Sequence, residues 1–150
     1  MDRKRIIIWA VIVLTLAFIL GQSLLSKDLS IKQSTIVQEQ VVEPVHKAVT
    51  GEDTISFDVR NIAHAIEFAL LGLELVLLFR NKKRILRGLK SVSYCGFFAL
   101  IDESIQYFSG RAPQVVDIWY DILGAVVGSI VGAIVVMVIG KIRTNGEVQI

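Results

Sequence analysis

Residues 118–140 read IWYDILGAVVGSIVGAIVVMVIG, an apolar run with one acid near its start and no basic residue. A helix needs about 20 mostly apolar residues to cross a bilayer, and this run has that length. Hydrophobic residues make up 53% of the chain and its mean hydropathy is +0.61, both high for a soluble domain. We therefore interpret the run as a transmembrane helix of a membrane protein.

Three earlier segments of similar length predict further spans. They lie at about residues 6–25, 61–79 and 89–108. The first contains no charged residue, whereas the second and third contain a few, so hydropathy identifies those two less directly. Together with residues 118–140, they predict an all-α membrane protein whose single domain, residues 1–150, folds as a four-helix transmembrane bundle.

The basic residues predict how these helices are oriented. Eleven of the sixteen lysines and arginines precede the first span, link the second to the third, or follow the fourth. Lys and Arg are retained on the cytoplasmic side of a membrane, so both termini are expected to be cytoplasmic. Residues 27–60 then form a long first external loop. Because the positive charge is explained by membrane orientation, nucleic acid is not expected as a partner.

The N-terminal run has a second interpretation. Residues 1–5 followed by an apolar run also resemble a secretory signal, with Gly21-Gln22-Ser23 as a small-x-small cleavage site. The run is long for a signal and the site is poor. Cleavage would leave three spans in the same orientation, and the sequence does not settle whether it occurs.

The external loop contains valines that recur every four residues, namely Val37, Val41, Val45 and Val49. This spacing predicts a short helix with one apolar stripe, lying on the outer membrane face or over the bundle. Pro44 would interrupt or bend that helix. The alternative is an unstructured valine-rich loop, which the proline and the β-branched residues would favour.

Polar residues gather in one layer of the predicted bundle. With the topology above, the early turns of the second and fourth spans and the end of the third span all lie at the outer leaflet, where Gln22 and Ser23 also end the first span. The polar residues there are His64, Glu67, Asp102, Glu103, Gln106, Asp117 and Asp121. Within each helix they are three or four residues apart and share a face. This pattern predicts an acid-rich pocket at the outer leaflet.

The number of acids in that layer requires compensation. A charge near the centre of a spanning helix costs about 2.5–3.5 kcal/mol, and five neighbouring carboxylates also repel each other. His64 and Arg111 are too few to balance them, so some acids must be protonated or must bind a cation. The candidate metal ligands are Glu67, Asp102 and Asp121. The cofactor is unknown from the sequence, and the candidate is a divalent cation: Mg²⁺, Mn²⁺, Ca²⁺ or Zn²⁺.

The fourth span carries a row of glycines, Gly124, Gly128 and Gly132, spaced by four. Such a row lets another helix approach closely. Asp117 and Asp121 continue it, and these acids need polar neighbours rather than lipid. The row therefore favours packing within the chain, with an oligomer formed through the same glycines as the alternative.

Residues 102–128, DESIQYFSGRAPQVVDIWYDILGAVVG, resemble the signature of the VanZ-like membrane protein family. Residues 61–68, NIAHAIEF, resemble an earlier motif of that family, H-x-x-E-[YF], which a basic residue usually precedes; here Arg60 does so. The resemblance covers nearly the whole chain apart from the long loop. It implies a multi-pass protein of the bacterial plasma membrane. The family is named for a membrane protein that lowers susceptibility to teicoplanin, a lipid-tailed glycopeptide antibiotic.

Three functions fit the polar layer. In an enzyme, catalysis would use His64, Glu67, Asp102, Glu103 and Asp121, and substrate binding would use Arg111, Gln106 and Asp117. Its substrate would be a cell-envelope lipid or a lipid-linked envelope precursor. In a binding protein, the same pocket would hold such a molecule without chemistry. In a structural protein, the acids would form a network that fixes the helix register. The sequence leaves enzymatic activity undecided.

Overall fold

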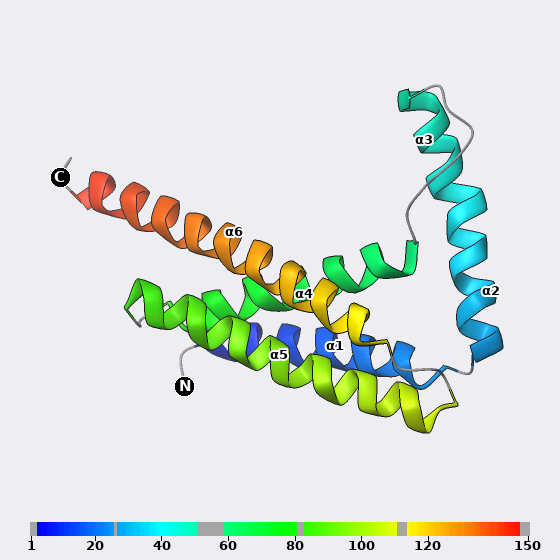
Figure 1. Cartoon of the computed structure of the whole chain (residues 1–150). Coiled ribbons are helices and arrows are strands. Elements are labelled where there is room, and N and C mark those ends of the chain that lie inside the picture. The colour runs from blue at the N-terminus through cyan, green and yellow to red at the C-terminus, as the bar shows by residue number, and fades with distance from the viewer. Residues whose placement is uncertain (1–2, 26, 51–58, 81–82, 111–113, 148–150) are drawn as a thin grey trace.

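The computed structural model describes residues 3–25, 27–50, 59–80, 83–110 and 114–147 (Figure 1). These residues are helical apart from short connections, and they include no strand. The elements in chain order are α1 (Arg3–Ser23), α2 (Lys27–Val37), the π-helical segment η1 (Gln38–Val42), α3 (Glu43–Thr50), α4 (Val59–Leu78), α5 (Arg84–Phe108) and α6 (Val115–Glu147). The prediction of an all-α chain is confirmed for this part of the sequence.

Among the described residues, three helices are long and apolar enough to cross a membrane: α1, α4 and, within α6, residues Val115–Ile142. They correspond to the first, second and fourth predicted spans. The helix α5 has 25 residues but carries Arg84, Arg87, Lys90, Asp102 and Glu103, so its composition alone does not identify a span. Membrane crossing by α5, and with it the four-span topology with cytoplasmic termini, stays a prediction.

The long helices pack around α4. The largest interface joins α4 to α6, α5 also packs on α6, and α1 contacts both α4 and α5. Their buried core is made of Ile12, Ile19, Phe68, Leu71, Leu75, Cys95, Ala99 and Ala125. In Figure 1 the start of α1 and the end of α6 lie at the same end of the molecule. The polar residues discussed below lie toward the opposite end.

The glycine row of α6 packs against α4 of the same chain. A Cβ added at Gly124 would overlap the backbone of Ala65, and one added at Gly128 would overlap the backbone of Ala69. At Gly132 the nearest atom is the carbonyl oxygen of Leu73, 3.1 Å from such a Cβ. The predicted packing within the chain is therefore confirmed. An oligomer that used these same glycines would have to displace α4.

Residues 27–50 form a helical rod that stands across the ends of the long helices (Figure 1). In η1 the Glu43 N–H donates to the Gln38 carbonyl, five residues back. This wider turn comes directly before Pro44, which cannot continue the α-helical hydrogen bonding. Val41, Val45 and Val49 are all exposed. The predicted helix with an apolar stripe is confirmed here and the unstructured alternative is wrong, while residues 51–58 lie outside the described part.

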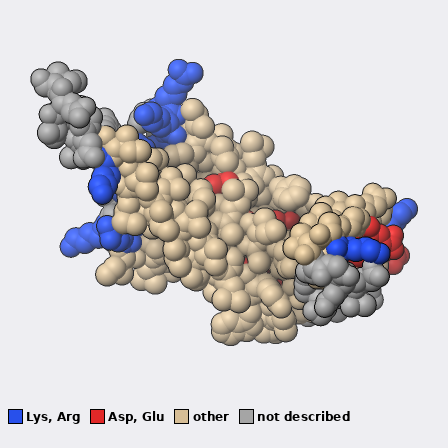
Figure 2. All heavy atoms as spheres, turned by 90° about the horizontal axis from the view of Figure 1, so that it is seen from above, with Lys and Arg blue, Asp and Glu red and all other residues tan. Residues whose placement is uncertain are grey.

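The surface between the two ends of the molecule is almost free of charge. Figure 2 shows Lys and Arg gathered at the end where α6 finishes, and acids with bases at the opposite end. Large apolar side chains are exposed on the helices between, including Leu14, Phe18 and Ile130. Water disfavours such a surface, whereas the hydrocarbon of a bilayer would cover it.

Candidate functional site

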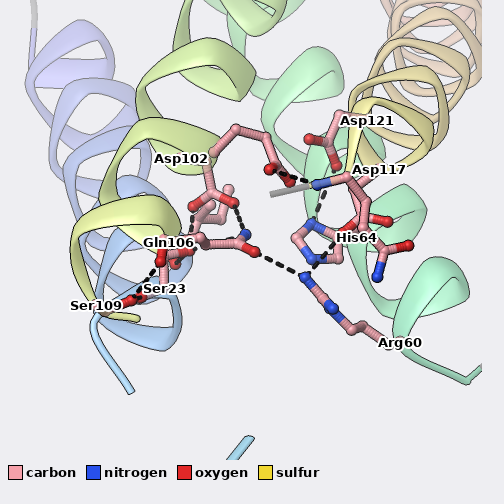
Figure 3. A network of polar contacts seen from close by, with 11 residues as sticks. Ser23, Arg60, His64, Asp102, Gln106, Ser109, Asp117 and Asp121 are labelled. Carbon is pink, nitrogen blue, oxygen red and sulfur yellow. Dashed lines mark hydrogen bonds and ion pairs between the residues drawn. The ribbon is translucent and has the colours of Figure 1, made fainter. Parts of the chain in front are cut away.

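The end of α1, the start of α4, the end of α5 and the start of α6 converge on one buried polar cluster (Figure 3). We define this polar cluster by the buried residues Ser23, His64, Asp102, Glu103, Gln106, Asp117 and Asp121, together with the half-buried Arg60. The sequence predicts this convergence from the depth of each residue along its helix. Six of the predicted side chains lie in this cluster: His64, Asp102, Glu103, Gln106, Asp117 and Asp121.

Hydrogen bonds connect the four helices through this cluster. Ser23 Oγ donates to Asp102 Oδ1, and Gln106 Nε2 donates to Asp102 Oδ2 at 2.7 Å. Arg60 Nη2 in turn donates to Gln106 Oε1 at 2.7 Å and forms an ion pair with Asp117 Oδ2 at 2.8 Å. One continuous chain of contacts therefore runs from α1 through α5 and α4 to α6.

His64 and Asp121 form a second part of the cluster. His64 Nδ1 lies 3.2 Å from Asp121 Oδ1, close enough for an ion pair when the imidazole is protonated. Asp121 is fully buried and its Oδ2 lacks a hydrogen-bond partner among the described residues. Ligand atoms of His64, Asp121 and Asp102 lie within 4.8 Å of one another. These three side chains could therefore contact a single small cation.

Glu103 points toward the start of α6. Its Oε2 accepts a hydrogen bond from the backbone N–H of Gln114 at 3.1 Å, and Gln114 directly precedes that helix. A carboxylate is stabilised at a helix N-terminus by the unpaired N–H groups and by the helix dipole. Glu103 was predicted to be catalytic, and its contacts favour a role in holding α6 in place.

A cavity of about 150 Å³ opens beside the cluster, between α1, α2 and α4. We call it the lateral cavity. Its polar lining comes from Gln22, Ser23, Ser30, Gln33, Ser34, Arg60, His64 and Glu67, and its apolar lining from Ile19, Val37, Val59 and Ala63. Glu67 lines this cavity and does not belong to the group that His64 forms with Asp102 and Asp121. The structure groups two of the predicted candidate ligands, Asp102 and Asp121, with His64, and metal binding by these residues stays a prediction.

Comparison with known proteins gives the family. Residues 6–137 match the family model described as VanZ/LLP1. The chain belongs to the VanZ-like family. The matched region of this VanZ-like chain includes the whole polar cluster and the lateral cavity. No curated protein and no solved structure matches it significantly.

Several residues of the VanZ-like site were missed from the sequence. Arg60 lies in the polar cluster, paired with Asp117, whereas Arg111, the arginine predicted to bind substrate, lies outside the described residues. The sequence could have indicated Arg60 as a site residue, because Arg60 stands four residues before His64 and therefore shares a helix face with it. Ser30, Gln33 and Ser34 also have helical spacing, but nothing in the loop indicated that this face of α2 would meet α4.

Proposed function

We propose that this VanZ-like protein is a multi-pass protein of the bacterial plasma membrane that binds the polar head of an envelope lipid or lipid-linked molecule at its outer face. The observation that carries the proposal is the composition of the lateral cavity. Its lining combines a guanidinium from Arg60, an imidazole from His64 and a carboxylate from Glu67. A molecule with a charged head and an apolar tail fits such a cavity beside membrane-spanning helices.

Arg60 supports an anionic head group. Its side chain is 23% exposed although Nη2 is held by Asp117, and it lines the cavity. A guanidinium carries five N–H donors in a planar fork, which suits phosphate or carboxylate oxygens. The contacts of Nη2 with Asp117 and Gln106 restrain the orientation of this fork beside the cavity.

His64 supports chemistry on the bound molecule. Its ring lines the cavity on one side and faces Asp121 through Nδ1. A carboxylate behind an imidazole can fix its orientation and its tautomer, and such an imidazole is a common general acid or base. We therefore extend the proposal to an enzyme that acts on the lipid head, with a link to teicoplanin susceptibility through the change in the envelope.

A cavity-filling variant tests the binding proposal. Ala63 lines the cavity, so Ala63→Trp should fill it, whereas Ala17 is exposed on α1 and Ala17→Trp adds the same side chain outside it. The proteins are purified in detergent, and the lipid that remains bound is identified by native mass spectrometry. We expect the native chain and Ala17→Trp to retain an anionic lipid and Ala63→Trp to lose it. Equal retention by both variants, or none by the native chain, would contradict the proposal.

A second candidate function rests on the hydrogen-bond chain from Ser23 to Asp117. This chain of contacts joins α1, α5, α4 and α6, as a network that fixes helix register would. In that case the protein would be a structural element of the membrane, and filling the cavity would leave its stability and its cellular effect unchanged.

A further inference from the structure

We propose that His64, Asp102 and Asp121 bind one divalent transition-metal ion, Zn²⁺ or Mn²⁺. The three side chains come from α4, α5 and α6, all three are buried, and one ligand atom of each lies within 4.8 Å of the others. The inference goes beyond lipid binding, and it stands or falls independently of which molecule enters the lateral cavity.

Among the described residues, His64 is the basic side chain that faces Asp121, and Asp102 is held by neutral donors from Ser23 and Gln106. Asp117 pairs with Arg60, and Glu103 accepts a backbone N–H at the start of α6. In the part of the chain that the structure describes, no lysine or arginine forms an ion pair with Asp102 or Asp121. With a neutral imidazole, the group carries a charge of about −2, which one divalent ion would balance.

The spacing of His64 and Asp121 also fits a metal ion. Their facing atoms, His64 Nδ1 and Asp121 Oδ1, are 3.2 Å apart. Two ligand atoms bound tetrahedrally at about 2.0–2.2 Å from zinc are themselves about 3.3–3.6 Å apart, so a small shift of either side chain would let both bind one ion. Asp121 is fully buried and its Oδ2 has no hydrogen-bond partner among the described residues, which is costly without a cation.

Asp102 is oriented as a metal-binding carboxylate would be. Ser23 donates to its Oδ1 and Gln106 donates to its Oδ2. Carboxylates that bind metals are commonly held by outer hydrogen bonds of this kind. Each carboxylate oxygen has two lone pairs, so these donors leave acceptor capacity on Asp102 for an ion between it and His64.

The ligand types select the ion. One imidazole with two carboxylates suits Zn²⁺ or Mn²⁺, whereas Ca²⁺ requires about six to eight oxygen ligands and Mg²⁺ prefers oxygen alone. Three protein ligands leave a coordination position open, as in catalytic zinc sites. Because His64 also lines the lateral cavity, that position can be reached by the polar head of a bound molecule.

Metal analysis of the purified chain tests the site. The protein is extracted in detergent, treated with a chelator, dialysed against Zn²⁺ or Mn²⁺ and measured by plasma mass spectrometry and calorimetry. We expect about one ion per native chain and an affinity that falls at least about tenfold in Asp121→Asn and in His64→Gln. Glu74→Gln is the matched control, because Glu74 is also a buried acid. Its Oε1 accepts a hydrogen bond from Thr15 Oγ1 at 2.9 Å, and it does not belong to the group of proposed metal ligands.

Two further readouts use the unaltered chain, so the result does not depend on the folding of a variant. Added Zn²⁺ should raise the Tm of the native protein, since ligands stabilise the state that binds them. Added Co²⁺ should give the intense visible absorption of a tetrahedral site. If the native chain bound no ion and gave neither signal, the proposal would be overturned. His64 and Asp121 would then form an imidazolium–carboxylate pair without a metal. Equal affinity in Asp121→Asn and Glu74→Gln would overturn it as adventitious binding.

The two proposals fail in different ways. Metal analysis is done without lipid, so its failure says nothing about the lateral cavity. If the Ala63→Trp variant binds metal but loses lipid, its metal site is intact and its cavity is blocked. A chain that retains lipid after Asp121→Asn while losing its ion would show that lipid binding does not require the metal.

Discussion

Gln106 illustrates how one side chain determines the geometry of the polar cluster. It is fully buried, donates to Asp102 and accepts from Arg60. An amide can do both at once because it carries a donor and an acceptor on the same plane. It thereby links the acid Asp102 of α5 to the base Arg60 of α4.

Replacing Gln106 by leucine tests this connection. The variant removes the hydrogen bond that Gln106 donates to Asp102 Oδ2 and the one that it accepts from Arg60 Nη2. Leaving a buried polar group unsatisfied costs about 1–3 kcal/mol. We expect the free energy of unfolding, measured by titration with a denaturing detergent, to fall by about that amount. Ser104→Ala on the same helix is the control, because Ser104 is exposed and bonds only to Leu100 of its own helix. An equal effect of the two changes would show that the network does not stabilise the fold.

The sequence predicted which residues share the layer, because depth in a membrane follows from position along a helix. It did not predict which of them meet. Glu67 and His64 are one turn apart on α4, yet only His64 joins the group formed with Asp102 and Asp121. The choice depends on the rotation of α4 against α5 and α6, which is set by packing over the whole interface and not by local spacing.

At the scale of elements, the contact between α4 and α6 positions the site. Both helices contribute small residues to it, with Gly72 of α4 against Ala125 of α6 and Gly124 of α6 against Ala65 of α4. Close backbone approach brings the start of α6 against the start of α4. His64 and Asp121 then face each other across the interface.

A single methyl group tests this interface. Gly124→Ala would place a Cβ against the backbone of Ala65, so the helices must separate, and overpacking of this kind costs about 1–3 kcal/mol or more. Gly96→Ala is the control, since a Cβ there meets nothing within 4 Å and alanine favours a helix by about 0.5–1 kcal/mol. Thermal unfolding in detergent should show a lower Tm only for Gly124→Ala. Equal Tm values would contradict the packing described above.

The rod made by α2, η1 and α3 could be predicted only in part. The valine spacing indicated a helix, because it repeats near the helical period. The valine spacing could not indicate where this helix docks. Residues 27–60 contain no membrane-spanning segment, so their depth in the membrane cannot be read from the sequence. The structure places Ser30, Gln33 and Ser34 of α2 on the lateral cavity, which closes the side of the cavity away from the long helices.

At the scale of the whole molecule, the charge distribution and the site give one consistent orientation. Basic side chains gather at the end where α6 finishes, and the almost uncharged belt separates that end from the polar cluster (Figures 1 and 2). Under the positive-inside rule we expect the basic end to be cytoplasmic. With that orientation, the proposed lipid-binding cavity would open at the outer leaflet.

The claim on which the proposed function depends is that the lateral cavity faces the outside of the cell. Single cysteines replace Lys47 or Lys83, both exposed, in a Cys95→Ser background, since Cys95 is the chain's only cysteine. Intact cells are treated with a membrane-impermeant maleimide. We expect labelling at Lys47→Cys in intact cells and at Lys83→Cys only after permeabilisation. Labelling of Lys83→Cys in intact cells with protection of Lys47→Cys would place the cavity in the cytoplasm and contradict the proposal.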